Sequence, residues 1–171
     1  PAWECKTGSK LRKVKNSVCS ACYALKGNYT RYKNIKIAQY RRLAAIKLEG
    51  WTRAMAAQIL RQKYFRWHDA GDVQDLDHLN KIYQVCELTP DVKHWMPTRE
   101  AWIKKHLDRK PANLVIRFSP PMIGQRNDSW PNSSMVVETG ATCPAPDQNN
   151  SCGSCRQCWD PEIKVVSYGK H

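Results

Sequence analysis

The sequence predicts an α/β fold, an open (partial) parallel βα barrel with a basic N-terminal helical segment and a cysteine-rich C-terminal loop. Strand-like and helix-like segments alternate from residue 64 onward, which is typical of parallel sheets with crossover helices. Only four or five strands fit into the chain of 171 residues, whereas a complete eight-stranded barrel needs at least about 200. Hydrophobic residues make up 42% and charged residues 25% of the chain, as in ordinary globular domains.

We expect a single domain, residues 1–171, because this length can bury one hydrophobic core. It is divided into an N-terminal cysteine loop (1–28), basic helices (29–63), a βα core (64–140), and a cysteine cluster loop with the final strand (141–171).

The basic segment is predicted to form two helices separated at Gly50. Apolar residues recur there at steps of three and four, at Ile37, Tyr40, Ala44 and Leu48, and then at Trp51, Met55 and Ile59. Such a stripe normally faces the core, so the charged residues of these helices are expected on their other faces.

In the βα core the spacing of apolar residues alternates between the period of a strand and the period of a helix. Strands are predicted at 64–67, 92–96, 114–118, 135–137 and 163–167, and helices at 75–88 and 99–108. The helix at 75–88 places Leu76, Leu79, Tyr83 and Cys86 on one face. Cys86 is therefore interpreted as a core residue, not a metal ligand.

Charge is concentrated in the first third of the chain. The formal net charge is +13, and residues 1–66 hold 16 basic residues against two acids, Glu4 and Glu49. This asymmetry favours a nucleic acid or another polyanion as partner, and a solvated basic helix without a partner is the alternative. The candidate contact residues are Arg31, Lys33, Lys36, Arg41, Arg42 and Lys47.

No apolar run approaches the ~20 residues that span a bilayer, so a membrane partner is not expected. The chain begins at Pro1 without the pattern of a signal peptide, and a cytoplasmic location is predicted.

The eight cysteines fall into two groups and one isolated residue. The C-terminal group, Cys143-x8-Cys152-x2-Cys155-x2-Cys158, supplies four thiolates for one centre. A zinc ribbon usually has two separate Cys-x2-Cys pairs, whereas this run is closer to a bacterial ferredoxin pattern. The spacing favours a four-iron cluster, with zinc and a structural disulfide as alternatives.

The N-terminal group consists of Cys5, Cys19 and Cys22. Three protein thiolates on a four-iron cluster leave one iron free to bind a substrate or cofactor. One centre drawing ligands from both ends of the chain is an alternative to two centres.

Polar residues also gather where the predicted strands end, which is where parallel sheets place functional groups. They are His68, Asp69, Asp72, Thr98, Arg99, Arg117, Ser119, Glu138 and Thr139. Asp72 is either a ligand-binding residue or the cap of the following helix, and Asp75 is a rival cap.

Three motifs resemble a family of bacteriophage proteins related to the radical S-adenosylmethionine enzymes. They are Ser17-Val-Cys-Ser-Ala-Cys-Tyr-Ala24, His68-Asp-Ala-Gly-Asp72, and the tail from Cys143-Pro to Cys158-Trp-Asp160. The resemblance implies a partial parallel barrel whose reduced cluster cleaves S-adenosylmethionine to a carbon radical. It assigns the amino group and ribose of that cofactor to Asp72 and Asp69. The usual signature of these enzymes is Cys-x3-Cys-x2-Cys, whereas 13 residues separate Cys5 from Cys19 here.

Three functions follow from these patterns. The first is a phage-type iron–sulfur protein, similar to radical enzymes, that binds or acts on nucleic acid. The second is a zinc-stabilised nucleic-acid-binding module without catalysis. The third is an electron-transfer or regulatory iron–sulfur protein.

Overall fold

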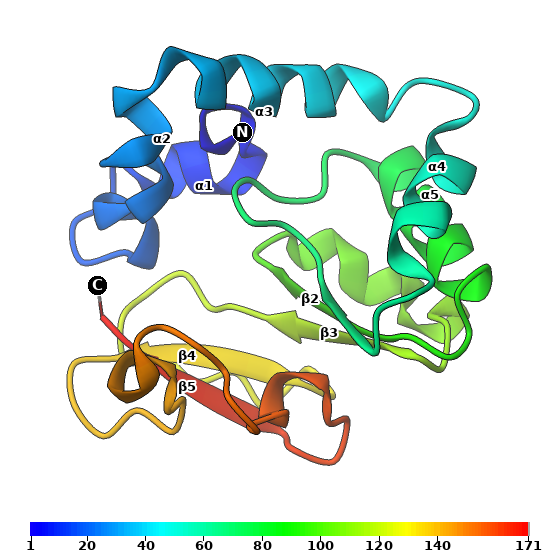
Figure 1. Ribbon diagram of the computed structural model, residues 1–171. Coiled ribbons are helices and arrows are strands. Elements are labelled where there is room, and N and C mark those ends of the chain that lie inside the picture. The colour runs from blue at the N-terminus through cyan, green and yellow to red at the C-terminus, as the bar shows by residue number, and fades with distance from the viewer. Residues whose placement is uncertain (171) are drawn as a thin grey trace.

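The computed structural model describes residues 1–170 and contains one curled, five-stranded parallel sheet (Figure 1). The strands are β1 (Tyr64–Arg66), β2 (Lys93–Thr98), β3 (Leu114–Phe118), β4 (Ser133–Val137) and β5 (Val165–Gly169). Their spatial order follows the chain, β1-β2-β3-β4-β5, and every neighbouring pair is parallel. This half-barrel confirms the predicted open parallel α/β barrel. β3 and β4 pair only at Phe118 and Ser133, so the sheet is weakest there.

The helices precede and cross over the first three strands. They are α1 (Lys6–Leu11), α2 (Asn28–Arg31), α3 (Lys33–Ala45), α4 (Trp51–Ile59) and α5 (Leu76–Glu87). Asp75 caps α5, because its Oδ1 accepts a hydrogen bond of 2.8 Å from the His78 amide. The helix predicted at 99–108 is a 3-10 helix, η4 (Ala101–Arg109).

Short 3-10 turns take the place of helices near both cysteine groups. At the N-terminus these are η1 (Ala2–Glu4), η2 (Val18–Ala21) and η3 (Tyr23–Leu25), and toward the C-terminus η5 (Ala145–Gln148) and η6 (Gln157–Trp159). Within residues 1–170 no α-helix follows β3 or β4, and only the short η5 and η6 lie between β4 and β5. The second half of the sheet is therefore covered by irregular chain.

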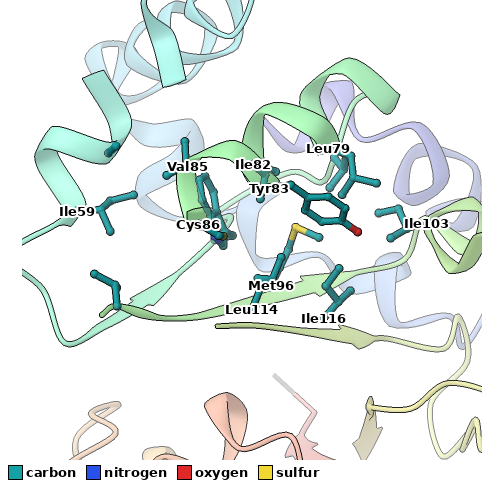
Figure 2. Packing of buried hydrophobic residues seen from close by; sticks show 14 of the residues in the cluster. Ile59, Leu79, Ile82, Tyr83, Val85, Cys86, Met96, Ile103, Leu114 and Ile116 are labelled. Carbon is teal, nitrogen blue, oxygen red and sulfur yellow. The ribbon is translucent and has the colours of Figure 1, made fainter. Parts of the chain in front are cut away.

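The main core lies between the sheet and the α4–α5 layer. Figure 2 shows Leu79, Ile82 and Cys86 of α5 packed toward Met96 of β2 and Ile116 of β3. Cys86 is fully buried, which confirms its interpretation as a core residue. Alternate residues of β2 and β3 face this core because successive side chains of a strand point to opposite sides.

The opposite face of the sheet carries a second, smaller cluster. Trp95 of β2 and Val166 of β5 pack there against Cys158, with Trp159 and Tyr168 at the margin. Residues of the C-terminal cysteine loop thus fill the position that a second layer of helices occupies in most parallel sheets.

Two expectations for apolar faces are wrong. In α3 only Gln39 is buried, and Ile37, Tyr40 and Leu48 of the predicted stripe are 45%, 38% and 63% exposed. Leu76 is 42% exposed because it occupies the first turn of α5. The period of three and four identified the helices correctly, but α3 lies over the N-terminal segment (Figure 1) and not on the main core.

The N-terminal segment lies across the carboxyl ends of the strands. The Val18 amide donates to the Pro121 carbonyl at 2.8 Å, just beyond β3. Thr7 binds Glu100, just beyond β2, through its amide at 3.1 Å and its hydroxyl at 3.0 Å. In the part of the chain described here, no helix has the length and apolar character needed to cross a bilayer.

Candidate functional site

The two cysteine groups lie on different parts of the sheet. Figure 1 shows the N-terminal residues (blue) above one end of the strands and residues 141–160 (orange) beside β4 and β5. Contacts agree with this view, since Cys158 packs on the sheet face through Trp95, whereas residues 7 and 18 bind the strand ends. The geometry favours two separate centres over one shared centre.

Cys5 and Cys19 are held close together by the absence of a side chain at Gly8. A Cβ at Gly8 would lie 2.9 Å from Cys5 Sγ and 3.6 Å from Cys19 Sγ. Gly8 is a buried residue of α1, so only glycine leaves this space beside both sulfurs. The third cysteine, Cys22, is close enough for its charge to raise the pKa of Cys19.

Charges around these thiols oppose one another. Burial raises the pKa of Cys5 to about 11, and the Asp72 carboxylate adds to this rise. Burial also raises the pKa of Cys19, but the Arg99 guanidinium opposes that shift. Arg99 Nε is buried without a hydrogen-bond partner in residues 1–170. The site therefore has a cation beside the Cys19 sulfur that would favour a thiolate.

Asp72 connects the loop after β1 to the end of β2. Its Oδ1 accepts from the Val73 amide at 2.8 Å and from Thr98 Oγ1 at 2.7 Å, and its Oδ2 accepts from the Arg99 amide at 2.8 Å. Burial raises its pKa to about 6 in spite of these bonds. Asp72 is thus neither the cap of α5 nor a free carboxylate, and its contacts favour a positioning role.

Asp69 is exposed and accepts hydrogen bonds from two tyrosines. Its carbonyl accepts a 2.5 Å hydrogen bond from the Tyr23 hydroxyl, and its Oδ1 accepts a 2.8 Å bond from the Tyr29 hydroxyl. Asp69 and Glu100 therefore bind the N-terminal segment, whereas Asp72 bonds only to residues at the strand ends. Arg117 departs from that pattern because its side chain lies on the opposite sheet face.

Arg117 of β3 binds the backbone of the C-terminal cysteine loop. It is fully buried and donates five hydrogen bonds to backbone carbonyls. They run from Nε to Cys158 at 3.0 Å, from Nη1 to Ile163 at 2.8 Å and Ser133 at 3.4 Å, and from Nη2 to Gln157 and Asp160, both at 2.8 Å. Within residues 1–170, no carboxylate forms an ion pair with Arg117.

The Cys158 sulfur lies beside this guanidinium. It is 3.0 Å from the Tyr168 hydroxyl, and burial raises the pKa of the thiol. The Tyr168 hydroxyl and Arg117 oppose this rise, whereas the neighbouring Cys143 and Cys152 contribute to it. Cys143, Cys152 and Cys158 are therefore close enough to interact electrostatically. Cys155 follows Cys152 in the same turn, and its amide donates a 2.9 Å hydrogen bond to the Cys152 carbonyl.

Neither group has the finished geometry of a metal site. All eight cysteines are free thiols. Among residues 1–170, no three His, Cys, Asp or Glu side chains converge as ligands of one ion would. The sulfur donors of each group fit a thiolate-bound centre, but binding would require the cysteine side chains to turn toward a common point.

The basic residues lie apart from the sheet on α2, α3 and the turn after it. All six are exposed, and none forms an ion pair within residues 1–170: Arg31, Lys33, Lys36, Arg41, Arg42 and Lys47. The Lys36 ammonium lies 5.0 Å from the centre of the Trp3 ring. The predicted charged surface therefore exists as a free face of α3.

Sequence reasoning missed the roles of Glu100, Tyr23 and Tyr29. Glu100 is buried and holds α1 over β2, and its Oε2 also accepts from Trp102 Nε1 at 3.1 Å. Its position directly after the strand-end residues Thr98 and Arg99 was the available signal. No signal in the sequence pairs Tyr23 and Tyr29 with Asp69, because that contact spans about forty residues.

Comparison with known proteins gives one match. The family model described as gene product 88 matches residues 2–161. The comparisons with curated proteins and with solved structures gave no match.

Proposed function

This chain belongs to the gene product 88 family, and we propose that it is a phage-type metal–thiolate protein with iron–sulfur clusters at its cysteine groups. The observation that carries this proposal is the fully buried Arg117 beside Cys158. A buried guanidinium without a carboxylate partner costs several kcal/mol of folding free energy unless another negative group lies near it. The Cys158 thiol, once ionised, can provide such a charge beside Arg117, in addition to the more distant Asp160 carboxylate.

A metal centre would supply that negative charge. Four thiolates outweigh the charge of a zinc ion or an iron–sulfur core, so either centre is anionic. In the free protein the Cys158 thiol resists ionisation, because burial raises its pKa. Binding of a metal replaces the thiol proton and leaves the sulfur negative next to Arg117.

The N-terminal group is the better candidate for chemistry. Its three cysteines lie at the carboxyl ends of the strands, where parallel sheets place ligands. A cluster held by Cys5, Cys19 and Cys22 would keep one coordination position for a small molecule. S-adenosylmethionine remains a prediction of the resemblance, because Asp69 and Asp72 already accept hydrogen bonds from the protein.

A polyanion contact is proposed for the free face of α3. Within residues 1–170 its cations are exposed and form no ion pair, and its apolar residues Ile37 and Tyr40 are exposed as well. Nucleic acid fits this combination, because phosphates bind the cations and bases contact apolar side chains. In a bacteriophage protein this contact would take place in the cytoplasm of the infected host.

The test is metal analysis of protein purified without oxygen. Iron with sulfide, and broad absorption near ~400 nm, are expected for the iron–sulfur assignment. Stoichiometric zinc in a colourless protein would instead support the zinc-stabilised module.

Single cysteine variants assign the ligands. Cys19→Ser should remove metal from the N-terminal group, and Cys155→Ser should remove it from the C-terminal group. Cys86→Ala is the matched control, since Cys86 lies in the core and should leave metal content unchanged (Figure 2). Full-length protein that holds neither metal after reconstitution would overturn the proposal.

A further inference from the structure

An open hollow of about 310 Å³ lies next to the N-terminal cysteine group. It begins directly before Cys22 and is lined by Ala21, Tyr23, Lys26, Gly27, Asn28 and Tyr29. Its volume lies within the range of small-ligand pockets. The walls are mainly apolar, although the hollow opens to solvent. The metal chemistry proposed above does not use this surface.

Two tyrosine rings form its aromatic part. Their centres are 5.9 Å apart and their planes meet at 67°, so they are arranged edge to face. Tyr23 is 48% exposed as a whole residue. Exposure of so much aromatic surface has a cost in water, and a flat ligand that covers the ring would remove it.

The two tyrosine hydroxyls are held by hydrogen bonds within the protein and are not available to such a ligand. Both donate hydrogen bonds to Asp69, at 2.5 Å from Tyr23 and at 2.8 Å from Tyr29. Gly27 makes the turn between the two tyrosines with a φ of +52°, a conformation that other residues rarely adopt. The rings are therefore held in place before a ligand binds, which lowers the entropy lost on binding.

The charge around the hollow is positive. Lys26 lines it and is exposed, and the exposed Arg31 follows at the end of α2. Asp69 is the carboxylate at the tyrosines, and the Arg66 guanidinium lies near enough to oppose the burial-driven rise in the pKa of Tyr23. An aromatic surface with the exposed Lys26 in its lining fits a phosphate-linked ligand with flat rings.

We propose that the hollow lined by Tyr23 and Tyr29 binds an unpaired base of a single-stranded nucleic acid, which stacks on the exposed Tyr23 while its phosphates contact Lys26 and the cations of α3. In a duplex the faces of the bases are covered by their neighbours, so a single strand is the form that can enter. This inference rests on the proposed contact with nucleic acid, and it adds the form of the strand and the residues that bind its base.

The experiment compares oligonucleotides of equal charge in fluorescence anisotropy. A labelled oligothymidine of about 12 nucleotides should bind the full-length protein about tenfold more tightly than an abasic strand of the same length. Tyr23→Ala should reduce this ratio to near one and leave the affinity for the abasic strand unchanged. Tyr32→Ala is the matched control, because Tyr32 is 51% exposed but does not line the hollow.

A measurement on the unmodified protein avoids dependence on folding of the variant. Photo-crosslinking of an oligonucleotide that contains 5-bromodeoxyuridine should label the peptide with Tyr23 and Tyr29. Equal affinity for oligothymidine and abasic strands, or labelling elsewhere, would overturn the stacking site. If both oligonucleotides still bind and the double variant Arg41→Glu, Arg42→Glu lowers the affinity for both, the proposed polyanion contact stands although the stacking site fails. Absence of all binding at low salt would overturn both.

Discussion

Replacement of Arg117 by Met tests whether the C-terminal thiols are ionised around a metal. Arg117 is fully buried and makes five hydrogen bonds to carbonyls, including those of Cys158 and Asp160. Removing one member of a buried, charge-compensated pair typically costs about 3–5 kcal/mol of unfolding free energy. In metal-free protein the loss should be smaller, because the thiols are then neutral and Met relieves the cost of an uncompensated guanidinium.

The difference between the two losses is a coupling free energy between Arg117 and the metal. A coupling of about 1–3 kcal/mol corresponds to a decrease in metal affinity of about 5- to 150-fold. Urea unfolding with and without metal measures the two losses, and competition with a chelator measures the affinity independently. The two results must agree, because they close one thermodynamic cycle.

Two further variants separate charge from hydrogen bonding. Arg117→Lys keeps the charge but not the planar set of donors, so metal affinity should fall less than in Arg117→Met. Arg61→Met is the control at an exposed arginine. Equal destabilisation by Arg117→Met in the metal-loaded and metal-free protein would show that Arg117 only supports the loop, and the argument for ionised thiols would fail.

Two other predictions concern the N-terminal group and the core. Gly8→Ala should lower metal content at the N-terminal group although it removes no ligand, because its Cβ would lie 2.9 Å from Cys5 Sγ; Gly169→Ala, where nothing lies within 4 Å, should have no effect in the same metal assay. The unfolding free energy should also fall on acidification from pH 6.5 toward 4. Burial lowers the pKa of His94 to about 4 in the folded chain. Between its unfolded and folded pKa values, the unfolded chain therefore binds a proton that the folded chain does not. Denaturation at several pH values should show a slope smaller by up to about 1.4 kcal/mol per pH unit in His94→Gln, and an unchanged slope would contradict this assignment.

Local pattern was sufficient to predict the strands and most helices. The run at 114–118 forms β3 at the predicted residues, and the break at Gly50 separates α3 from α4 as expected. Apolar spacing reports which residues share a helix face, but not what covers that face. Ile37 and Leu48 of α3 are exposed for this reason, since the helix lies over the N-terminal segment.

The candidate site depends more on long-range contacts, and these were less predictable. Spacing identified both cysteine groups, and the parallel sheet predicted that residues such as Asp72 and Thr98 would meet. The binding of Glu100 to Thr7 joins positions 93 residues apart, and neither residue carries a motif. Arg117 was expected at the strand ends, but strand alternation directs its side chain to the sheet face instead.

The separation of the two cysteine groups implies different roles for them. Parallel sheets are normally buried on both faces, yet here irregular chain with Cys158 and Trp159 covers one face, over Trp95 of β2 and Val166 of β5. Such a segment has few apolar residues to hold it, so metal binding would add folding free energy where a helix is missing. The N-terminal group lies instead at the strand ends, next to the Tyr23–Tyr29 hollow. Loss of C-terminal metal should therefore lower stability first, whereas loss of N-terminal metal should leave the main core folded.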